Sequence, residues 1–125
     1  MKAYTDLPQS KKLAKILPLE SADMLFQLRE DKYADSIRVP LTKKHWEQMM
    51  PDIIPCWSLS SLLNVIPKHI DRFNVLRIDI GEEDFSIWYD EIGSGVNNDL
   101  PDVTKESAVD ACYEMIVKLK KKNLL

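Results

Sequence analysis

The stretch that decides the fold is residues 74–90, which read NVLRIDIGEEDFSIWYD. Two runs of alternating apolar and polar residues stand on either side of Gly81 and the acidic turn that follows it. Because successive side chains of a strand point to opposite faces, this pattern predicts an antiparallel hairpin. Its apolar face would carry Leu76, Ile78, Ile80, Phe85, Ile87 and Tyr89. Its opposite face would carry Arg77, Asp79, Ser86, Trp88 and Asp90.

A further strand is predicted upstream, where residues 24–29 read MLFQLR and alternate again. We expect this strand to join the hairpin in one small antiparallel sheet. Residues 37–39 can add a short strand, whereas the glycines and polar residues of 92–102 are typical of a loop.

Apolar residues recur at helical spacing in three segments, near 7–17, 59–66 and 104–122. A residue that commonly caps helices stands at the start of each, namely Asp6, Ser58 and Thr104. A fourth short helix can follow Thr42 and end at Pro51. Together these elements predict an α+β fold, in which one face of the sheet packs on three or four helices.

The composition is that of one globular domain spanning residues 1–125, with 45% hydrophobic and 30% charged residues. A net charge of −3 does not favour a general polyanion binder. No apolar run approaches the roughly 18 residues of a membrane span. The first residues lack the apolar core of a signal peptide, and the two cysteines lack metal-binding spacing. We therefore expect a cytoplasmic protein with reduced thiols, and neither a metal nor a cofactor.

Cys56 is the first candidate for chemistry, because it lies just before a predicted helix and the chain also contains His45 and His69. A helix N-terminus or a histidine can lower the pKa of a thiol and make it a nucleophile. The competing interpretation is a buried core thiol, pinned between Pro55 and Trp57, with the tryptophan packed back onto the first turn of a fully buried helix. We favour the buried thiol, and for Cys112, on the apolar stripe of the last helix, we expect the same.

Charged clusters are two further candidates. Asp79, Glu82, Glu83 and Asp84 could gather a divalent cation, but their spacing matches no calcium loop, and a solvated turn explains them. Four lysines within residues 118–122 could bind nucleic acid, but helices commonly end in cations, and no aromatic residue lies among them.

The polar face of the hairpin is the best candidate for binding. It places Trp88 beside Arg77 and Asp79, and tryptophan with arginine is the composition of an interaction hot spot. A helix or a loop could also cover this face, since the chain has several predicted helices.

Four phrases carry a resemblance that spans nearly the whole chain. They are QSKKLAKILPLESADM at 9–24, IIPCWSLSSLL at 53–63, FSIWYDEI at 85–92 and DACYEMIVKLKKKNLL at 110–125. The chain resembles a family of small uncharacterised proteins from Bacteroides-type gut bacteria and their prophages or mobile elements. The resemblance implies a cytoplasmic bacterial or phage-derived protein, and it assigns no catalytic or binding residue.

The sequence contains no glycine-rich phosphate loop, no HxxxH or CxxC pair and no GxSxG motif. The leading hypothesis is therefore a non-enzymatic interaction module that binds a protein partner through Trp88, Arg77 and Asp79. One alternative is a small hydrolase or transferase that uses Cys56 with a histidine. A second is a nucleic-acid-binding accessory protein that uses the C-terminal lysines.

Overall fold

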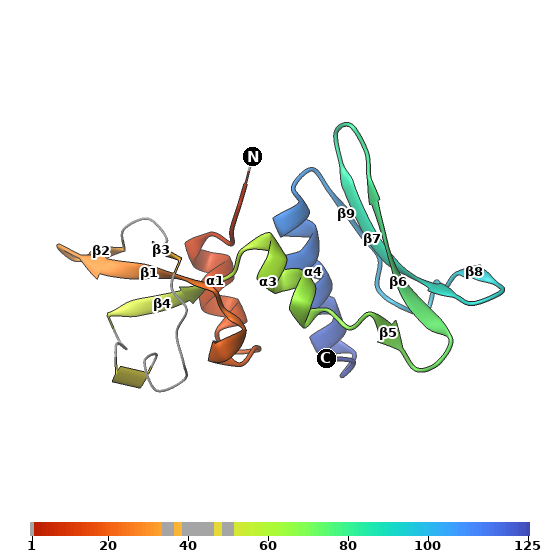
Figure 1. The fold of residues 1–125 in the computed structure, drawn as a ribbon, viewed down its shortest axis with the longest axis horizontal. Coiled ribbons are helices and arrows are strands. Elements are labelled where there is room, and N and C mark those ends of the chain that lie inside the picture. Colours follow the sequence, from red (N-terminus) through yellow and green to blue (C-terminus); the bar gives the residue numbers. More distant parts are fainter. Residues whose placement is uncertain (1, 34–36, 39–46, 49–51) are drawn as a thin grey trace.

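Two antiparallel sheets lie on opposite sides of a layer of helices in the computed structural model (Figure 1). It describes residues 2–33, 37–38, 47–48 and 52–125. The predicted α+β class is confirmed, but the single predicted sheet is wrong, because the strand near 24–29 and the hairpin belong to different sheets. Most of the helix predicted between Thr42 and Pro51 lies outside the described residues.

The first sheet is built around β1 (Met24–Arg29), the strand predicted at 24–29. It pairs antiparallel with β2 (Lys32–Tyr33), β3 (Ile37–Arg38) and β4 (Ile53–Cys56). The short strand predicted at 37–39 corresponds to β3. β4 was not predicted. It pairs with β1 from Met24↔Cys56 to Gln27↔Ile53, and β1 is paired within its own sheet rather than with the hairpin.

The second sheet contains the predicted hairpin. Its strands are β5 (His69–Ile70), β6 (Asn74–Ile80), β7 (Phe85–Glu91), β8 (Gly95–Val96) and β9 (Val103–Lys105). In the hairpin register Leu76 lies opposite Tyr89, Ile78 opposite Ile87 and Arg77 opposite Trp88, so the two predicted faces are confirmed. β7 is the central strand, because β6 pairs with one side of it and β8 and β9 with the other.

The helices between the sheets are α1 (Leu7–Leu13), α3 (Leu59–Val65) and α4 (Ala108–Lys121), with a 3-10 turn, η1, at Leu19–Ser21. Asp6 and Ser58 cap α1 and α3 as predicted, each accepting a hydrogen bond from the backbone N–H three residues on. The predicted start of the last helix is wrong. Ser107 caps α4, because Thr104 is already committed to β9, where it pairs with β7.

α3 is amphipathic rather than fully buried, since Leu62 faces the core while Ser60 and Asn64 are exposed. The core itself is continuous across the molecule. One cluster of buried side chains joins Leu25 and Ile53 of the first sheet to Ile87 and Tyr89 of the second, with helical residues between them. In the described part of the chain, no helix combines the length and apolar character needed to cross a bilayer.

Candidate interaction surface

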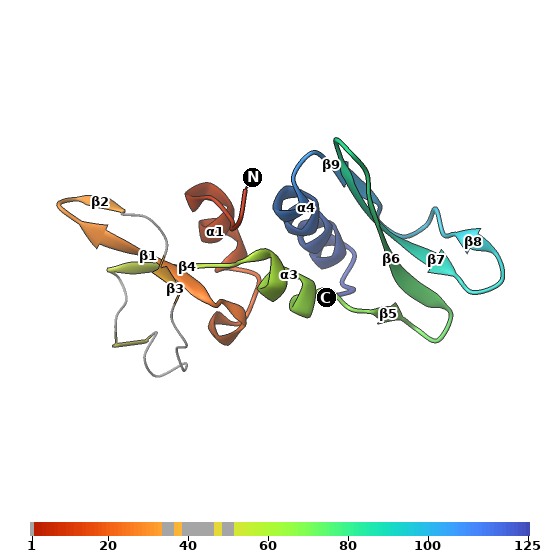
Figure 2. The same ribbon diagram turned by 45° about the horizontal axis from the view of Figure 1, so that its top comes forward.

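The outer face of the second sheet carries the predicted binding residues. α4 packs against β7 and β9 from the inner side, and the described helices all lie on that side of the sheet (Figure 1). The same arrangement is visible after rotation of the molecule (Figure 2). The competing interpretation is that a helix or a loop covers this face. Among the described residues no helix covers it, whereas Asp102 of the loop before β9 lies beside Trp88. Trp88 is partly exposed on this face, and Arg77 and Asp79 are exposed.

A single carboxylate orders the two large side chains of this face. The indole N–H of Trp88 donates to Asp90 Oδ1 at 2.7 Å. Arg77 Nε lies 3.4 Å from Asp90 Oδ2, and the Arg77 side chain is 57% exposed. Asp90 contacts both the indole and the guanidinium and so restricts their motion before any partner binds. A partner that contacts these side chains therefore loses less conformational entropy than it would with freely rotating ones.

The surroundings of Trp88 are mixed rather than apolar. A shallow depression of about 240 Å³ is lined by Trp88, Asp79, Ser86, Val96, Asp102 and Thr104, among others. The hydroxyl groups of Ser86 and Thr104 are hydrogen-bonded at 2.8 Å. Val96 is the exposed apolar member, at 56% exposure. The surface therefore suits a partner that offers polar groups as well as an apolar contact.

Cys56 is a buried thiol, as we favoured. Its side chain is 0% exposed. Its Sγ donates to the backbone carbonyl of Thr5 at 3.4 Å and accepts from Thr5 Oγ1 at 3.6 Å. Burial raises the pKa of the Cys56 thiol, and the Thr5 hydroxyl offsets only part of that rise. His69 lies in β5 of the other sheet and His45 lies outside the described residues, so the described structure brings no histidine to this thiol.

Cys112 is also buried and free, and burial raises its pKa to about 12. Both thiols are thus kept in the protonated form at neutral pH, whereas nucleophilic chemistry uses the thiolate.

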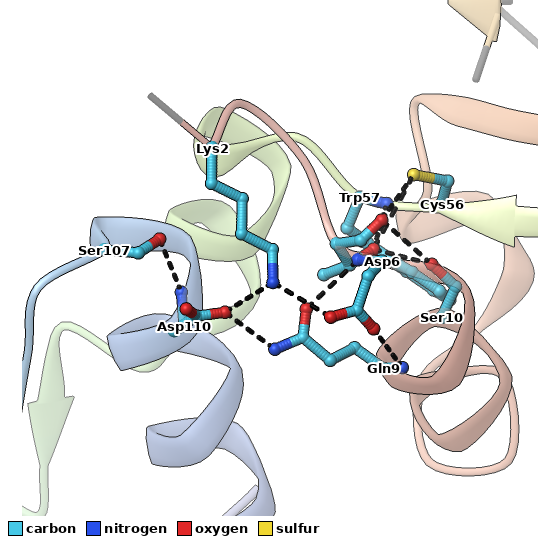
Figure 3. A network of polar contacts seen from close by, with 9 residues as sticks. Lys2, Asp6, Gln9, Ser10, Cys56, Trp57, Ser107 and Asp110 are labelled. Carbon is cyan, nitrogen blue, oxygen red and sulfur yellow. Dashed lines mark hydrogen bonds and ion pairs between the residues drawn. The ribbon is translucent and has the colours of Figure 1, made fainter. Parts of the chain in front are cut away.

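A polar network that the sequence reading missed ties α1 to α4 (Figure 3). Lys2 Nζ donates to Asp110 Oδ1 at 2.6 Å and to Asp6 Oδ2 at 3.0 Å. Gln9 Nε2 donates to the same Asp110 oxygen at 2.8 Å. Partial burial alone would raise the pKa of Asp110, but the hydrogen bonds from Lys2 and Gln9 outweigh it and lower that pKa. Part of this network had a local signal, because the spacing of Asp6 and Gln9 is that of a capping box.

The network lines a groove of about 500 Å³ between α1 and α4. The charges in it are largely matched, since Lys2 pairs with Asp6 and Asp110, and Lys105 pairs with Glu114 at 3.1 Å. An acid or base already satisfied in this way is poorly placed to bind or move a proton. We therefore interpret the polar contacts in this groove as structural: they hold the first helix against the last.

The two other charged clusters are the acidic turn after β6 and the lysines at the end of α4. Asp79, Glu82, Glu83 and Asp84 are all exposed, and within the described residues no group of His, Cys, Asp and Glu is arranged to hold a metal ion. Lys118 and Lys122 donate to the backbone carbonyls of Asp102 and Asp99, at 3.3 and 3.2 Å. These two hydrogen bonds connect the loop before β9 to the end of α4, while Lys120 and Lys121 are exposed.

No protein family model, curated protein or solved structure matches this chain.

Proposed function

We propose that the protein is a non-enzymatic interaction module that binds a partner protein through the outer face of β6 and β7. The observation that carries this proposal is a sheet face without helical cover among the described residues, on which Asp90 contacts both Trp88 and Arg77. Tryptophan and arginine are among the residues enriched at the energetic centres of protein interfaces. Asp79, exposed beside them, would supply a polar contact at the rim.

The position of Trp88 within the sheet strengthens the argument. It belongs to β7, whose neighbours Ile87 and Tyr89 are 0% exposed on the other face. A side chain on such a strand has a rigid base, which suits a preformed binding surface better than a loop does. Two free, buried cysteines are compatible with the cytoplasmic location that we include in the proposal.

The alternatives receive less support. A cysteine-dependent enzyme needs an accessible thiol, whereas Cys56 is buried and its pKa is raised. A nucleic-acid site at the end of α4 would rest on four lysines in a chain of net charge −3, with no aromatic residue among them.

The test is a pull-down from bacterial extract read by quantitative mass spectrometry, with wild type beside Trp88→Ala and Arg77→Ala. Phe73→Ala is the matched control, because Phe73 is an aromatic residue that is 60% exposed in the turn before β6. We expect a stoichiometric partner that wild type and Phe73→Ala retain and that both outer-face variants lose. Thermal unfolding of each variant checks that it is folded.

Two results would contradict the proposal. One is a partner that folded Trp88→Ala and Arg77→Ala retain as well as wild type does. The other is a wild type that retains no partner at all.

A further inference from the structure

The outer edge of β6 has backbone groups that are not paired with another strand. The N–H of Leu76 donates to the carbonyl of Lys68 at 2.9 Å, on the side away from β7. On β7, the carbonyl of Tyr89, opposite Leu76, accepts from Asn97 at 3.1 Å and so points away from β6. Peptide groups alternate in direction along a strand. The N–H and C=O groups of Ile78 and Ile80 therefore point outward as those of Leu76 do.

The described residues provide no strand to meet them. β5 pairs with β6 only at Asn74 and Val75, and neither Ile78 nor Ile80 has another backbone hydrogen bond on that side. An unpaired strand edge of this kind can accept a further strand.

The side chains next to this edge favour an apolar contact. Ile78 is 41% exposed and Ile80 is 78% exposed, on the helix-facing side of the sheet. Ile80 also borders a cleft of about 350 Å³, whose apolar lining includes Leu59, Phe85 and Ala108. A strand added along β6 would place every second side chain on the side of this cleft.

The charge around the cleft is negative. Glu82, Glu83, Asp84 and Glu106 line it, and all of them are exposed. None of these carboxylates forms an ion pair among the described residues. Lys2, the cation in the described lining, is already paired with Asp6 and Asp110. The rim is thus complementary to a cationic segment.

We propose that the free edge of β6 at residues 77–80 binds an extended segment of a partner protein in which apolar residues alternate with lysine or arginine. The segment adds as a strand through the backbone of Ile78 and Ile80. Its apolar residues lie on the side of the cleft, and its cations, on the opposite side of the sheet, lie beside Asp79 and, at the end near the turn, beside Glu82 and Glu83. This proposal rests on the proposed function in that the ligand is a protein. It concerns the sheet edge, however, and not the face that carries Trp88.

The first experiment uses a fluorescein-labelled, end-blocked peptide of four Lys-Val repeats and the full chain. Binding is followed by fluorescence anisotropy at low and moderate salt, and by titration of the ¹⁵N-labelled protein. We expect saturable binding that weakens with salt, together with slower hydrogen exchange at the amides of Ile78 and Ile80. A Glu-Val peptide and a Lys-Val peptide N-methylated at alternate residues should each bind at least about tenfold more weakly, because they lose charge complementarity or backbone hydrogen bonds.

Protein variants separate the edge from the outer face. Ile78→Pro should abolish peptide binding, because proline removes an outward N–H that the fold itself does not use. If Ile78→Pro does not fold, Ile80→Lys serves instead, since it replaces the apolar contact on the cleft side with a cation that repels a cationic segment. Trp88→Ala should bind the peptide as wild type does, so this experiment and the pull-down can fail separately.

Equal binding of the Lys-Val, Glu-Val and N-methylated peptides would overturn the proposal, as would no binding by wild type. Equal binding by wild type and by folded edge variants would also overturn it. A concentration-dependent dimer whose interface maps to β6 would overturn it too, because the edge would then be filled by a second copy of the chain.

Discussion

β6 and β7 are two strands of one hairpin with the same alternating sequence pattern, yet they differ sharply in burial. On β7 the inward residues Phe85, Ile87 and Tyr89 are 6%, 0% and 0% exposed, whereas on β6 Ile78 and Ile80 are 41% and 78% exposed. The reason is position. β7 is central in its sheet and packs against α4, whereas β6 lies beyond it, with β5 covering only its first residues. Alternation therefore shows which face a residue is on, and the sheet order decides how deeply it is buried.

Because they differ in burial, the two strands have different roles. β7 anchors the sheet to the helices and holds Trp88 on its outer face. β6 offers backbone and side-chain groups that the fold does not fully use, and these are the groups from which a binding surface can be made without loss of stability. The comparison can be tested strand by strand.

The largest effect should come from truncating the same residue type on each strand. Ile87→Ala should lower the free energy of unfolding by about 2–5 kcal/mol, because it leaves a cavity in a fully buried site. Ile80→Ala should change it by no more than about 0.5 kcal/mol, because the side chain is largely in water. Urea unfolding of both variants with wild type measures the difference.

Similar losses in the free energy of unfolding for Ile87→Ala and Ile80→Ala would contradict the difference in burial between β7 and β6. They would mean that Ile80 is covered in solution, for example by self-association through the edge of β6. Repeating the unfolding at several protein concentrations distinguishes that case, because only an associated state depends on concentration.

A smaller effect is expected at the end of β7. The Tyr89 hydroxyl donates to the carbonyl of Pro67 at 2.7 Å. Tyr89→Phe should therefore cost about 0.5–1.5 kcal/mol at pH 7, since it removes that bond and leaves a partly buried carbonyl without this partner. Calorimetric or denaturant unfolding near neutral pH gives the value.

The same variant carries a pH signature. Burial raises the pKa of Tyr89 above its ordinary value of 10.0, so its contribution to stability is complete below pH 10 and is lost as the pH rises further. Wild type should consequently lose its advantage over Tyr89→Phe above pH 10. The other groups with raised pKa values, Cys112 and Tyr113 among them, are common to both proteins and cancel in the difference. A constant difference through pH 11 would show that the phenol ionises freely in the folded protein.

Elements whose signals are local could be predicted from the sequence. The hairpin register, the caps at Asp6 and Ser58 and the burial of Cys56 all follow from residues within a few positions of one another. The same is true of the candidate surface, because alternation alone places Trp88 beside Arg77.

Elements that depend on distant partners could not be predicted. β4 contains Pro55, which argues against a strand, but its neighbours pair with β1 from nearly thirty residues earlier in the chain. Thr104 has the chemistry of a cap, and only its pairing with Ser86 on β7 shows that it belongs to a strand. The exposure of Ile80 has the same origin, since no local pattern tells an edge strand from a central one.

A smaller effect than that of Tyr89→Phe is expected on the outer face, where the two strands meet through Arg77 and Asp90. Arg77→Ala should change the free energy of unfolding by no more than about 1 kcal/mol, because exposed ion pairs contribute little and are screened by salt. Unfolding in low and high salt checks both statements, with Arg72→Ala as a matched control because Arg72 is an exposed arginine in the turn before β6. If Arg77→Ala instead costs more than about 2 kcal/mol, the pair holds β6 to β7, and the outer face is part of the fold's support. A small cost combined with loss of the partner would mean that Arg77 serves binding rather than stability, as expected for a residue on the less buried of the two strands.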